Sequence, residues 1–496
     1  MILSHDLGTT GNKATLVTDD GRLLQSAAVA YPVDFGPGGK AEQQPDDWWN
    51  AVVTASRTLL AQAKVEASDI DVVSFSGQMM GVVPVDSAGD PVRPAIIWAD
   101  TRSTAETAQL VDRVGMARAY RQTGHRLNPT YSLAKMMWLR ANEPDAYART
   151  ATFLQAKDYA VLRLTGVRVT DPSDASGTNA YDQTIGAWSD ELLDAAGVDM
   201  RLLPEIVAST TVVGGITTEA AAATGLLAGT PVVIGGGDGP TAALGAGIVD
   251  EHSGAYAYLG SSSWVSISAP EPLHDVLMRS MTFNHVVPGQ FVPTATMQAG
   301  GASLQWIVET LSPSEPLYDE LLADAAGASA AHDGLFFLPH LLGERSPYWN
   351  PLARAAFLGL QIHHGRAAMT RSVLEGVAFN LHTGLLAFAE NGRAATAIDV
   401  IGGAANAGLL LDIAADVWDM PVRTRNLVDE ANAVGAAVVG GVGVGIFDSF
   451  NVAAAFSSRT DERLPDPDRA LAYRSAYEPF MDGYRRLEPW FDSLVQ

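Results

Sequence analysis

The chain has 496 residues, a formal net charge of −24 at pH 7 and no cysteine. This length exceeds the size at which a single hydrophobic core stops growing, so at least two large domains are expected. The strong acidity argues against nucleic acid or an anionic membrane as a partner, because both are bound by basic surfaces. The lack of cysteine excludes disulfides, zinc–thiolate sites and cysteine nucleophiles.

The N-terminus and the late apolar segments together predict a cytoplasmic protein. No basic stretch ahead of an apolar segment follows Met1, so no signal peptide is expected. The most apolar late stretch, residues 435–447, is rich in glycine. It is also shorter than the roughly 18 residues that a membrane span requires. We therefore expect an enzyme of the cytoplasm.

The first 31 residues alternate apolar segments with polar turns, which predicts strand, glycine turn, strand, reverse turn and strand. Asp46 or Asp47 is then expected to cap a helix whose apolar residues recur at helical spacing. Residues 70–76 are a candidate for a short buried strand. A mostly helical region is predicted to follow, as far as Leu164.

The same pattern restarts near Pro231. A β-branched run leads into three glycines and Asp238, and two apolar segments follow at residues 255–259 and 264–267. A small polar turn, residues 260–263, joins these two segments, just as a polar turn joins the first two strands. The repetition predicts two similar α/β domains that face each other.

Two later helical patterns each follow a pair of glycines, Gly300-Gly301 and Gly402-Gly403. At such a helix N-terminus the backbone can approach a ligand closely, and free N–H groups are expected to point outward.

Residues 6–13 form the first candidate site for phosphate. Glycines let the chain bend around an anion, threonines add hydroxyl donors, and a lysine adds positive charge. Asp6, at the strand end, is suited to Mg²⁺, usually through water. The alternative is a plain hairpin in which Asp6 caps the turn. The residues assigned to the phosphates here are Gly8, Thr9, Thr10 and Lys13.

The polar turn of the second half is a matching phosphate loop. Alone it is a weak signal, because small polar residues are common in any tight turn. Two such hairpins, one per domain, would close on the same phosphates from opposite sides. The residues assigned to phosphate in this loop are Gly260, Ser261 and Ser262.

Asp238 is the candidate general base. It follows three glycines at the end of a buried strand and precedes a helix that is expected to start near Pro240. A carboxylate at a strand end that faces the other domain can accept a proton from a bound hydroxyl. The alternative is an ordinary helix N-cap. Capping explains the three glycines less well, because they give up backbone entropy without packing.

A sugar site is predicted on loops that follow strands, where aromatic groups stack on a ring and polar groups bond its hydroxyls. The competing interpretation places the two methionines of this stretch in the core and treats its Asp–Arg pair as a surface ion pair. The candidate sugar residues are Gln78, Met79, Met80, Trp98, Asp100, Arg102 and Asp238.

Taken together, these segments resemble the FGGY family of carbohydrate kinases, within the sugar kinase, actin and heat-shock-protein superfamily. The match runs in unbroken order from Asp6 to about Gly445. Residues 129–139 look like the family's first signature. Residues 343–347, 353–355, 359–360 and 374–378 look like its second, and further matches lie at 157–159, 164–166 and 175–178.

The resemblance implies two ribonuclease-H-like domains of actin-like ATPase type, with a catalytic cleft between them. The N-terminal domain, residues 1–244, would hold the sugar and the first phosphate loop, and the C-terminal domain, residues 245–496, the nucleotide. ATP would be the co-substrate and Mg²⁺ the metal, held by Asp6 and Asp238. Family members are often dimers, which implies a homodimer. The nucleotide pocket maps to Gly301, Gln305, Gly403, Ala404 and Asn406.

Within the family, the sequence around Gln78 looks like the xylulokinase branch, so a pentulose such as D-xylulose is the expected acceptor. Two positions depart from that branch: Met80 stands where histidine is usual, and Gly239 where asparagine is common. Each change removes a polar contact to the sugar. Because hydrogen bonds discriminate strongly between closely related sugars, these changes can alter which sugar is preferred. Alternative acceptors are glycerol, a tetritol, gluconate and a deoxy-sugar. A non-catalytic actin-like protein would predict loss of Asp238.

Overall fold

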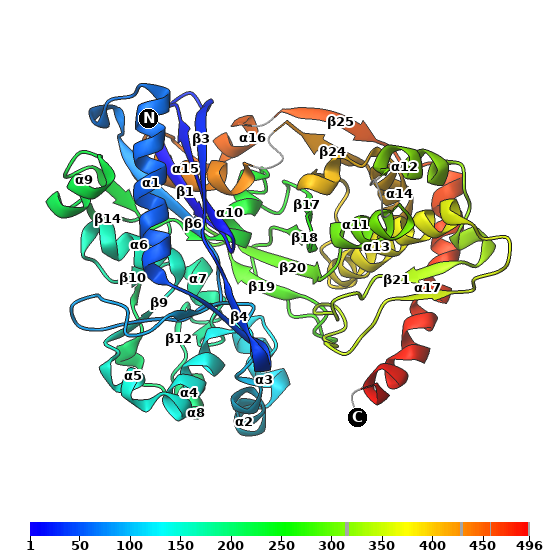
Figure 1. Cartoon of the computed structure of the whole chain (residues 1–496), viewed down its shortest axis with the longest axis horizontal. Helices are drawn as coiled ribbons and strands as arrows, with labels where there is room; N and C mark the ends of the chain where they lie inside the picture. The colour runs from blue at the N-terminus through cyan, green and yellow to red at the C-terminus, as the bar shows by residue number, and fades with distance from the viewer. Residues whose placement is uncertain (313–316, 427–429, 457, 495–496) are drawn as a thin grey trace.

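The structure, a computed structural model, describes residues 1–312, 317–426, 430–456 and 458–494 (Figure 1). The chain forms two α/β halves that lie side by side, each built on a seven-stranded sheet. The N-terminal half lies at the left of Figure 1, and the C-terminal half, which ends in the red helix, lies at the right.

The N-terminal sheet has the order β14-β15-β6-β1-β2-β3, and β16 also pairs with β6. Its first three strands form an antiparallel meander, β6 and β15 run parallel to β1, and β14 is antiparallel at the far edge. The strands are β1 (Ile2–Leu7), β2 (Gly11–Val17), β3 (Leu23–Ala30), β6 (Val72–Gly77), β14 (Val212–Gly215), β15 (Pro231–Val233) and β16 (Gly236–Gly237).

The C-terminal sheet has the order β19-β20-β18-β17-β23-β24-β25. Here β17, β18, β20 and β19 are antiparallel neighbours, β23 and β24 run parallel to β17, and β25 is antiparallel at the edge. The strands are β17 (Ala255–Leu259), β18 (Ser263–Ile267), β19 (Met281–Asn284), β20 (Phe291–Met297), β23 (Ile398–Ile401), β24 (Val422–Arg425) and β25 (Arg459–Arg463).

The two sheets therefore share one topology. An antiparallel hairpin, β1-β2 or β17-β18, leads each sheet, and the strand that pairs with its first member runs parallel to it. The predicted duplication, with two similar α/β domains, is confirmed. In both halves the polar turn of the leading hairpin lies at the same end of the sheet.

Successive residues of each strand point to opposite faces of the N-terminal sheet, so both faces carry apolar side chains. Helices cover both faces. Leu3 and Val73 point toward α1 (Pro45–Ala63) and α6 (Ala156–Thr165). Ile2 and Val72, one residue earlier in each strand, pack against α15 (Ala431–Gly443). A helix from the C-terminal part of the sequence thus covers one face of the N-terminal sheet (Figure 1).

The glycines of α15 allow this close packing. A Cβ at residue 435 would lie 2.0 Å from the carbonyl oxygen of Thr241 in α10 (Asp238–Gly245). A Cβ at residue 440 would lie 2.8 Å from the Cβ of Ser74 in β6. The glycine-rich apolar stretch near residue 435 is therefore an interior helix between α10 and the N-terminal sheet.

The C-terminal core packs the second sheet against long helices, chiefly α13 (Arg366–Glu390), α14 (Gly408–Trp418) and α17 (Pro467–Ser493). Among the described residues, α13 alone is long and apolar enough to cross a membrane by length and composition. However, 83% of its apolar window is buried inside the protein, which is typical of a core helix.

The first long helix begins earlier than predicted. α1 starts at Pro45, and Gln44 occupies its N-cap position without a side-chain cap. Asp46 and Asp47 lie in the first turn, so the prediction that one of them caps the helix is wrong. Proline fits the first helical position because its φ is pre-set and its missing N–H would have no partner there. Acidic side chains in the first turn interact favourably with the positive end of the helix dipole.

The remaining elements surround these two cores. The helices are α2 (Thr104–Val114), α3 (Met116–Thr123), α4 (Ser132–Asn142), α5 (Pro144–Arg149), α7 (Pro172–Ser176), α8 (Asp190–Ala196), α9 (Thr218–Thr224), α11 (Gly301–Leu311), α12 (Tyr318–Ala326) and α16 (Ala453–Phe456). The minor strands are β4 (Asp34–Gly36), β5 (Lys40–Gln43), β7 (Val83–Val85), β8 (Ala95–Ile96), β9 (Thr152–Leu154), β10 (Val169–Thr170), β11 (Tyr181–Asp182), β12 (Ala187–Trp188), β13 (Glu205–Ile206), β21 (Phe336–Leu338) and β22 (Ala356–Leu358). The predicted helical region before Leu164 is confirmed by α2 to α6.

The α10–α15 contact gives a testable prediction. Gly435→Ala is expected to lower the midpoint of urea unfolding, since the new methyl forces two packed helices apart at a cost of about 1–3 kcal/mol. Gly327→Ala, at the end of α12, is the matched control, because its Cβ would meet nothing closer than 4.0 Å. Equal midpoints for the two variants would contradict the packing described.

Candidate functional site

Two cavities lie on either side of the loop of residues 260–263. The first, of about 150 Å³, is lined by residues of both halves, including Met79, Met80, Trp98 and Asp238. The second, of about 530 Å³, is lined by residues of the C-terminal half. The polar loop between β17 and β18 borders both: Ser262 and Ser263 line the first cavity, and Gly260 and Ser261 the second.

Asp238 lies at the start of α10 and is half-buried. Burial of its carboxyl and the negative charge of Asp6 together raise the pKa of Asp238 to about 7. The N–H of Gly239 donates to its Oδ1 at 2.8 Å. A carboxylate with such a pKa is protonated and deprotonated near neutral pH, as a general base requires.

The glycines before Asp238 are required by close packing. Gly235 has φ +72°, and a Cβ there would lie 1.9 Å from the carbonyl oxygen of Phe75. A Cβ at Gly237 would lie 2.5 Å from the sulfur of Met79. The chain that carries Asp238 is thus pressed between β6 and the methionine that lines the first cavity. Simple helix capping does not require this proximity.

Asp6 is the last residue but one of β1 and is held by donors from two distant segments. Ser76 Oγ donates to its Oδ1 at 2.8 Å, and Asn432 Nδ2 lies 3.2 Å from both carboxylate oxygens. Burial raises the pKa of Asp6, and these two hydrogen bonds and the charge of Lys13 oppose that shift. Asn432 begins α15, so the C-terminal part of the chain fixes a carboxylate of the N-terminal sheet.

The first predicted phosphate loop, residues 8–10, is anchored on several sides. Tyr31 donates from its hydroxyl to Gly8 O at 2.6 Å, Gln43 Nε2 to Thr9 O at 2.8 Å, and Trp98 Nε1 to Thr9 Oγ1 at 2.9 Å. Thr10 is exposed. These bonds hold the loop rigidly beside Trp98, which also lines the first cavity.

Gln78 and Lys13 lie around this loop. Gln78 Nε2 donates to Gln43 Oε1 at 2.7 Å and to Gly8 O at 3.5 Å, so its side chain braces the loop. Lys13 forms an ion pair of 2.9 Å with Glu430, just before α15. Gln78 is not among the described residues that line the first cavity. Its assignment to the sugar, like that of Lys13 to phosphate, stays a prediction.

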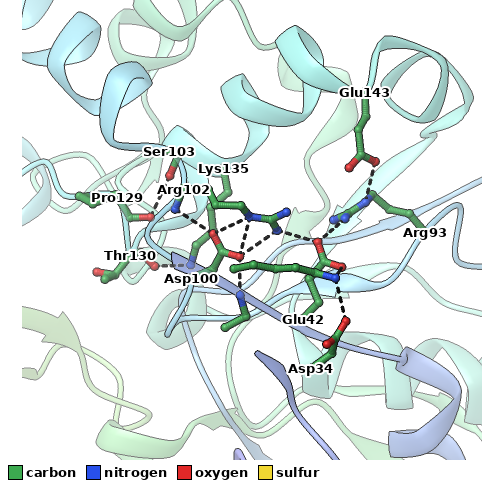
Figure 2. Close-up of polar contacts among 12 residues, drawn as sticks. Asp34, Glu42, Arg93, Asp100, Arg102, Ser103, Pro129, Thr130, Lys135 and Glu143 are labelled. Carbon is green, nitrogen blue, oxygen red and sulfur yellow. Dashed lines mark hydrogen bonds and ion pairs between the residues drawn. The ribbon is translucent and has the colours of Figure 1, made fainter. Parts of the chain in front are cut away.

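Asp100 and Arg102 belong to a polar network that also includes Glu42 (Figure 2). Arg102 bonds Asp100 through Nε at 2.9 Å and Glu42 through Nη2 at 2.6 Å, while its guanidinium lies 4.4 Å from the centre of the Trp138 ring. Asp100 is 1% exposed, so the pair is not the surface ion pair considered as an alternative. Neither residue is among the described residues that line the cavity.

Lys135 lies close to this network and binds the backbone at Met80 and Thr130 (Figure 2). Its ammonium donates to Met80 O at 2.8 Å and to Thr130 O, and burial lowers its pKa well below the usual range. Met80 has φ +63°, a conformation that a non-glycine residue rarely adopts. The bond from Lys135 therefore stabilises the backbone that presents Met80 to the cavity.

The second cavity collects all of the residues assigned to the nucleotide pocket. They share it with Tyr258, Leu304, Tyr318, Asp319, Leu322 and Ala407. However, the N–H groups of Gly301 and Ala302 donate to Gly260 O at 2.7 Å and Ser261 O at 3.1 Å. The prediction of free N–H groups at this helix start is therefore wrong for these two residues, because the phosphate loop uses them. The predicted residues lining the cavity are Gly260, Ser261, Gly301, Gln305, Gly403, Ala404 and Asn406.

Several residues of the first cavity were absent from the sequence-based site. Arg345 is one of them. It lies in residues 343–347, part of the segment that resembles the second signature, and that resemblance was a signal that could have identified it. Its Nε and Nη2 atoms are buried and have no hydrogen-bond partner among the described residues. The apolar lining gave no usable signal, because such residues look like core in a sequence. The other unpredicted lining residues are Tyr256, Trp264, Met281, Phe283, Thr294, Thr296, Met297 and Gln298.

Comparisons with known proteins match this arrangement. Residues 1–245 match the FGGY family of carbohydrate kinases, N-terminal domain, and residues 255–444 match its C-terminal domain. The chain is 32% identical to a xylulose kinase from Lactococcus lactis, covering 100% of this chain and 98% of that protein. It is 29% identical to a gluconokinase from Bacillus licheniformis, with coverage of 100% and 97%.

The fold is also that of solved kinases. The ligand-bound xylulose kinase from Lactobacillus acidophilus superimposes with a TM-score of 0.95 at 25% identity, covering 100% of this chain and 99% of that one. The two-domain fold expected from the sequence is thus confirmed.

The raised pKa of Asp238 gives a prediction about stability. An unfolded aspartate titrates near pH 3.9. From about pH 4 to 7 the folded protein therefore keeps a proton that the unfolded chain releases, and stability falls as pH rises through this window. Asp238→Asn cannot ionise, so in metal-free buffer it should raise the thermal midpoint over wild type more at pH 8 than at pH 5.

The control for this measurement is Asp112→Asn, an exposed substitution on α2. It should shift the thermal midpoint by the same small amount at both pH values. If the rise in thermal midpoint caused by Asp238→Asn did not grow with pH, the raised pKa of Asp238 would be contradicted.

Proposed function

The chain belongs to the FGGY family of carbohydrate kinases, and on that basis we propose that it transfers the γ-phosphate of ATP to a hydroxyl of a pentulose such as D-xylulose. The observation that carries this proposal is the loop of residues 260–263, which borders two cavities at once. A nucleotide in the larger cavity would direct its phosphates along this loop toward Asp238 in the smaller one.

Asp238 acts as the general base in this proposal. An acceptor hydroxyl in the first cavity would donate its proton to the carboxylate as its oxygen attacks the γ-phosphorus in line. The negative charge of Asp6 and burial both favour proton uptake by Asp238. Closure of the halves around the cavity would exclude water, which would otherwise compete as the acceptor.

Asp6 and Asp238 would hold Mg²⁺. Carboxylate oxygens are the ligands that this cation prefers. The negative charge of Asp6 raises the pKa of Asp238, and a bound cation would offset that repulsion. When bound, Mg²⁺ neutralises charge on the phosphoryl oxygens. Thr9, Thr10 and Lys13 on one side, and Ser261 and Ser262 on the other, would contact the phosphates.

The pentulose assignment is supported by relatives named xylulose kinases. The cavity is lined both by polar groups, including Asp238, Thr296 and Gln298, and by apolar side chains, including Met79, Met80 and Trp98. An acceptor with a small apolar face and several hydroxyls would suit this arrangement.

A sugar acid such as gluconate is the second candidate acceptor. The observation that favours it is Arg345, whose buried Nε and Nη2 atoms have no hydrogen-bond partner among the described residues. A carboxylate would accept from both, since the guanidinium fork matches carboxylate geometry. Gluconokinases are among the relatives of the chain.

The setting of the enzyme follows from the same family membership. We expect it to act in the cytoplasm as a homodimer, with sugar and ATP as partners and with neither nucleic acid nor membrane.

A panel of acceptors separates the candidates. In a coupled assay of ADP release we expect D-xylulose to give the highest kcat/KM among D-xylulose, D-ribulose, gluconate, glycerol, erythritol and 1-deoxy-D-xylulose. Buffer without acceptor is the control for ATP hydrolysis. Higher kcat/KM for gluconate would replace the pentulose by a sugar acid, and no stimulation by any acceptor would remove the kinase assignment.

Asp238→Ala tests the base. It is expected to lower sugar-dependent ADP release by about 10²–10⁴-fold, the usual contribution of a general base. Binding of ATP, measured by calorimetry, should persist because the nucleotide cavity lies on the other side of the 260–263 loop. Asp112→Ala is the control for loss of a carboxyl, and near-wild-type turnover of Asp238→Ala would contradict the assignment.

A further inference from the structure

A buried charge cluster lies behind the site and is used by no step of the proposed reaction. Lys157 Nζ lies 2.7 Å from Asp158 Oδ1, 2.9 Å from Asp171 Oδ1 and 2.9 Å from Asp174 Oδ2. All four side chains are fully buried. Lys157 and Asp158 lie in one of the stretches that resemble family motifs, residues 157–159, and Asp171 and Asp174 lie just before another, residues 175–178.

The cluster is held together by charge. Burial alone lowers the pKa of Lys157, but its three aspartates outweigh burial and raise that pKa well above the usual range. Burial and the neighbouring carboxylates raise the pKa of Asp174 well above its ordinary value. Breaking a buried pair of this kind is costly, because a charge is left without its partner. The cluster is therefore a rigid support.

A directed hydrogen-bond chain runs from this support to Asp238. Ser173 Oγ donates to Asp171 Oδ2 at 2.5 Å, so its lone pairs remain to accept. It accepts the N–H of Gly237 at 2.8 Å. Gly237 immediately precedes Asp238 and is the N-cap residue of α10, which has no side-chain cap of its own.

Ser173 is one of two opposing constraints on this peptide. On the other side, the side chain of Met79 fills the space where a Cβ of Gly237 would lie. The strand that carries Gly237, β16, has only two residues and pairs with β6 alone. The described hydrogen bond of the Gly237 N–H goes to the hydroxyl of Ser173, so this bond sets the orientation of the peptide within its packing.

We infer that Ser173 is a positioning residue for phosphoryl transfer: bonded to Asp171, it fixes the Gly237 N–H and so aims the Asp238 carboxylate at the acceptor hydroxyl. The inference rests on the proposed role of Asp238. Displacement of a reacting group by about 1 Å can cost as much as 10²-fold in rate, so a single buried bond at this point has a kinetic effect.

Ser173→Ala tests the inference. It is expected to lower kcat about 10- to 100-fold. KM for ATP should change less than about twofold, because neither Ser173 nor Gly237 lines the nucleotide cavity. A loss of stability alone would lower the active fraction, so kcat is normalised to folded protein by active-site titration with a tight-binding ADP analogue. Unchanged kcat would overturn the inference.

The chain offers a matched control in Ser209→Ala. Ser209 Oγ donates to the same Asp171 Oδ2 at 2.7 Å and is buried like Ser173. In the described contacts it makes no bond to Gly237, so its loss weakens the cluster without releasing the peptide. Its kcat should stay within about threefold of wild type, and a loss equal to that of Ser173→Ala would assign the effect to the cluster and overturn the role of Ser173.

Two further variants complete the test. Ser173→Thr keeps the hydroxyl and should recover most of kcat. If Ser173→Ala does not fold, Ser173→Cys gives the same comparison, since a thiol is a much weaker donor and acceptor. Failure of Thr to exceed Ala or Cys in kcat would overturn the inference.

A double variant separates this inference from the proposed function. If Ser173 acts through Asp238, adding Ser173→Ala to Asp238→Ala should not lower the residual rate further. Full activity of Asp238→Ala itself would refute the base. A large loss in Asp238→Ala with none in Ser173→Ala would leave the base in place and refute the positioning role. Additive losses would also refute it.

Discussion

The burial of Asp238 close to the charge of Asp6 is the constraint on which the site depends. Burial and the negative charge of Asp6 both oppose ionisation of Asp238, and together they raise its pKa to about 7. Such a pair is unfavourable for folding, so the surroundings must hold it in place. Ser76 and Asn432 donate to Asp6, while glycine packing and Ser173 hold the chain at Asp238. Strain of this kind is typical of functional sites.

This constraint also explains why the two halves are interlaced. α15 leaves the C-terminal half, covers one face of the N-terminal sheet and places Asn432 on Asp6. On the sugar side, Met79, Met80 and Tyr131 of the N-terminal half pack with Met281 and Phe283 of the C-terminal half. The cleft is thus built from contacts at two places, and the sequence division at residue 244 does not separate the packing units.

Much of the site was predictable because its signals are local. Glycines beside small polar residues marked both candidate phosphate loops, and the β-branched run before three glycines marked Asp238. Residues joined by packing left no such signal. Asn432 lies in an apolar helix 426 positions from Asp6. The cap of α1 was missed because proline and two aspartates compete for the first turn, and only the backbone conformation decides between them.

The sequence by itself determined the duplicated α/β architecture, the two polar hairpin turns and the family, because each is written in spacing and residue type over short stretches. The tertiary structure alone decided that the 260–263 loop borders both cavities, that Asp100 and Arg102 belong to a buried network, and that Ser173 meets Gly237. The physical reason is range. A turn or helix depends on neighbours along the chain, whereas burial, electrostatic repulsion and hydrogen bonding between distant segments exist only after the chain has folded.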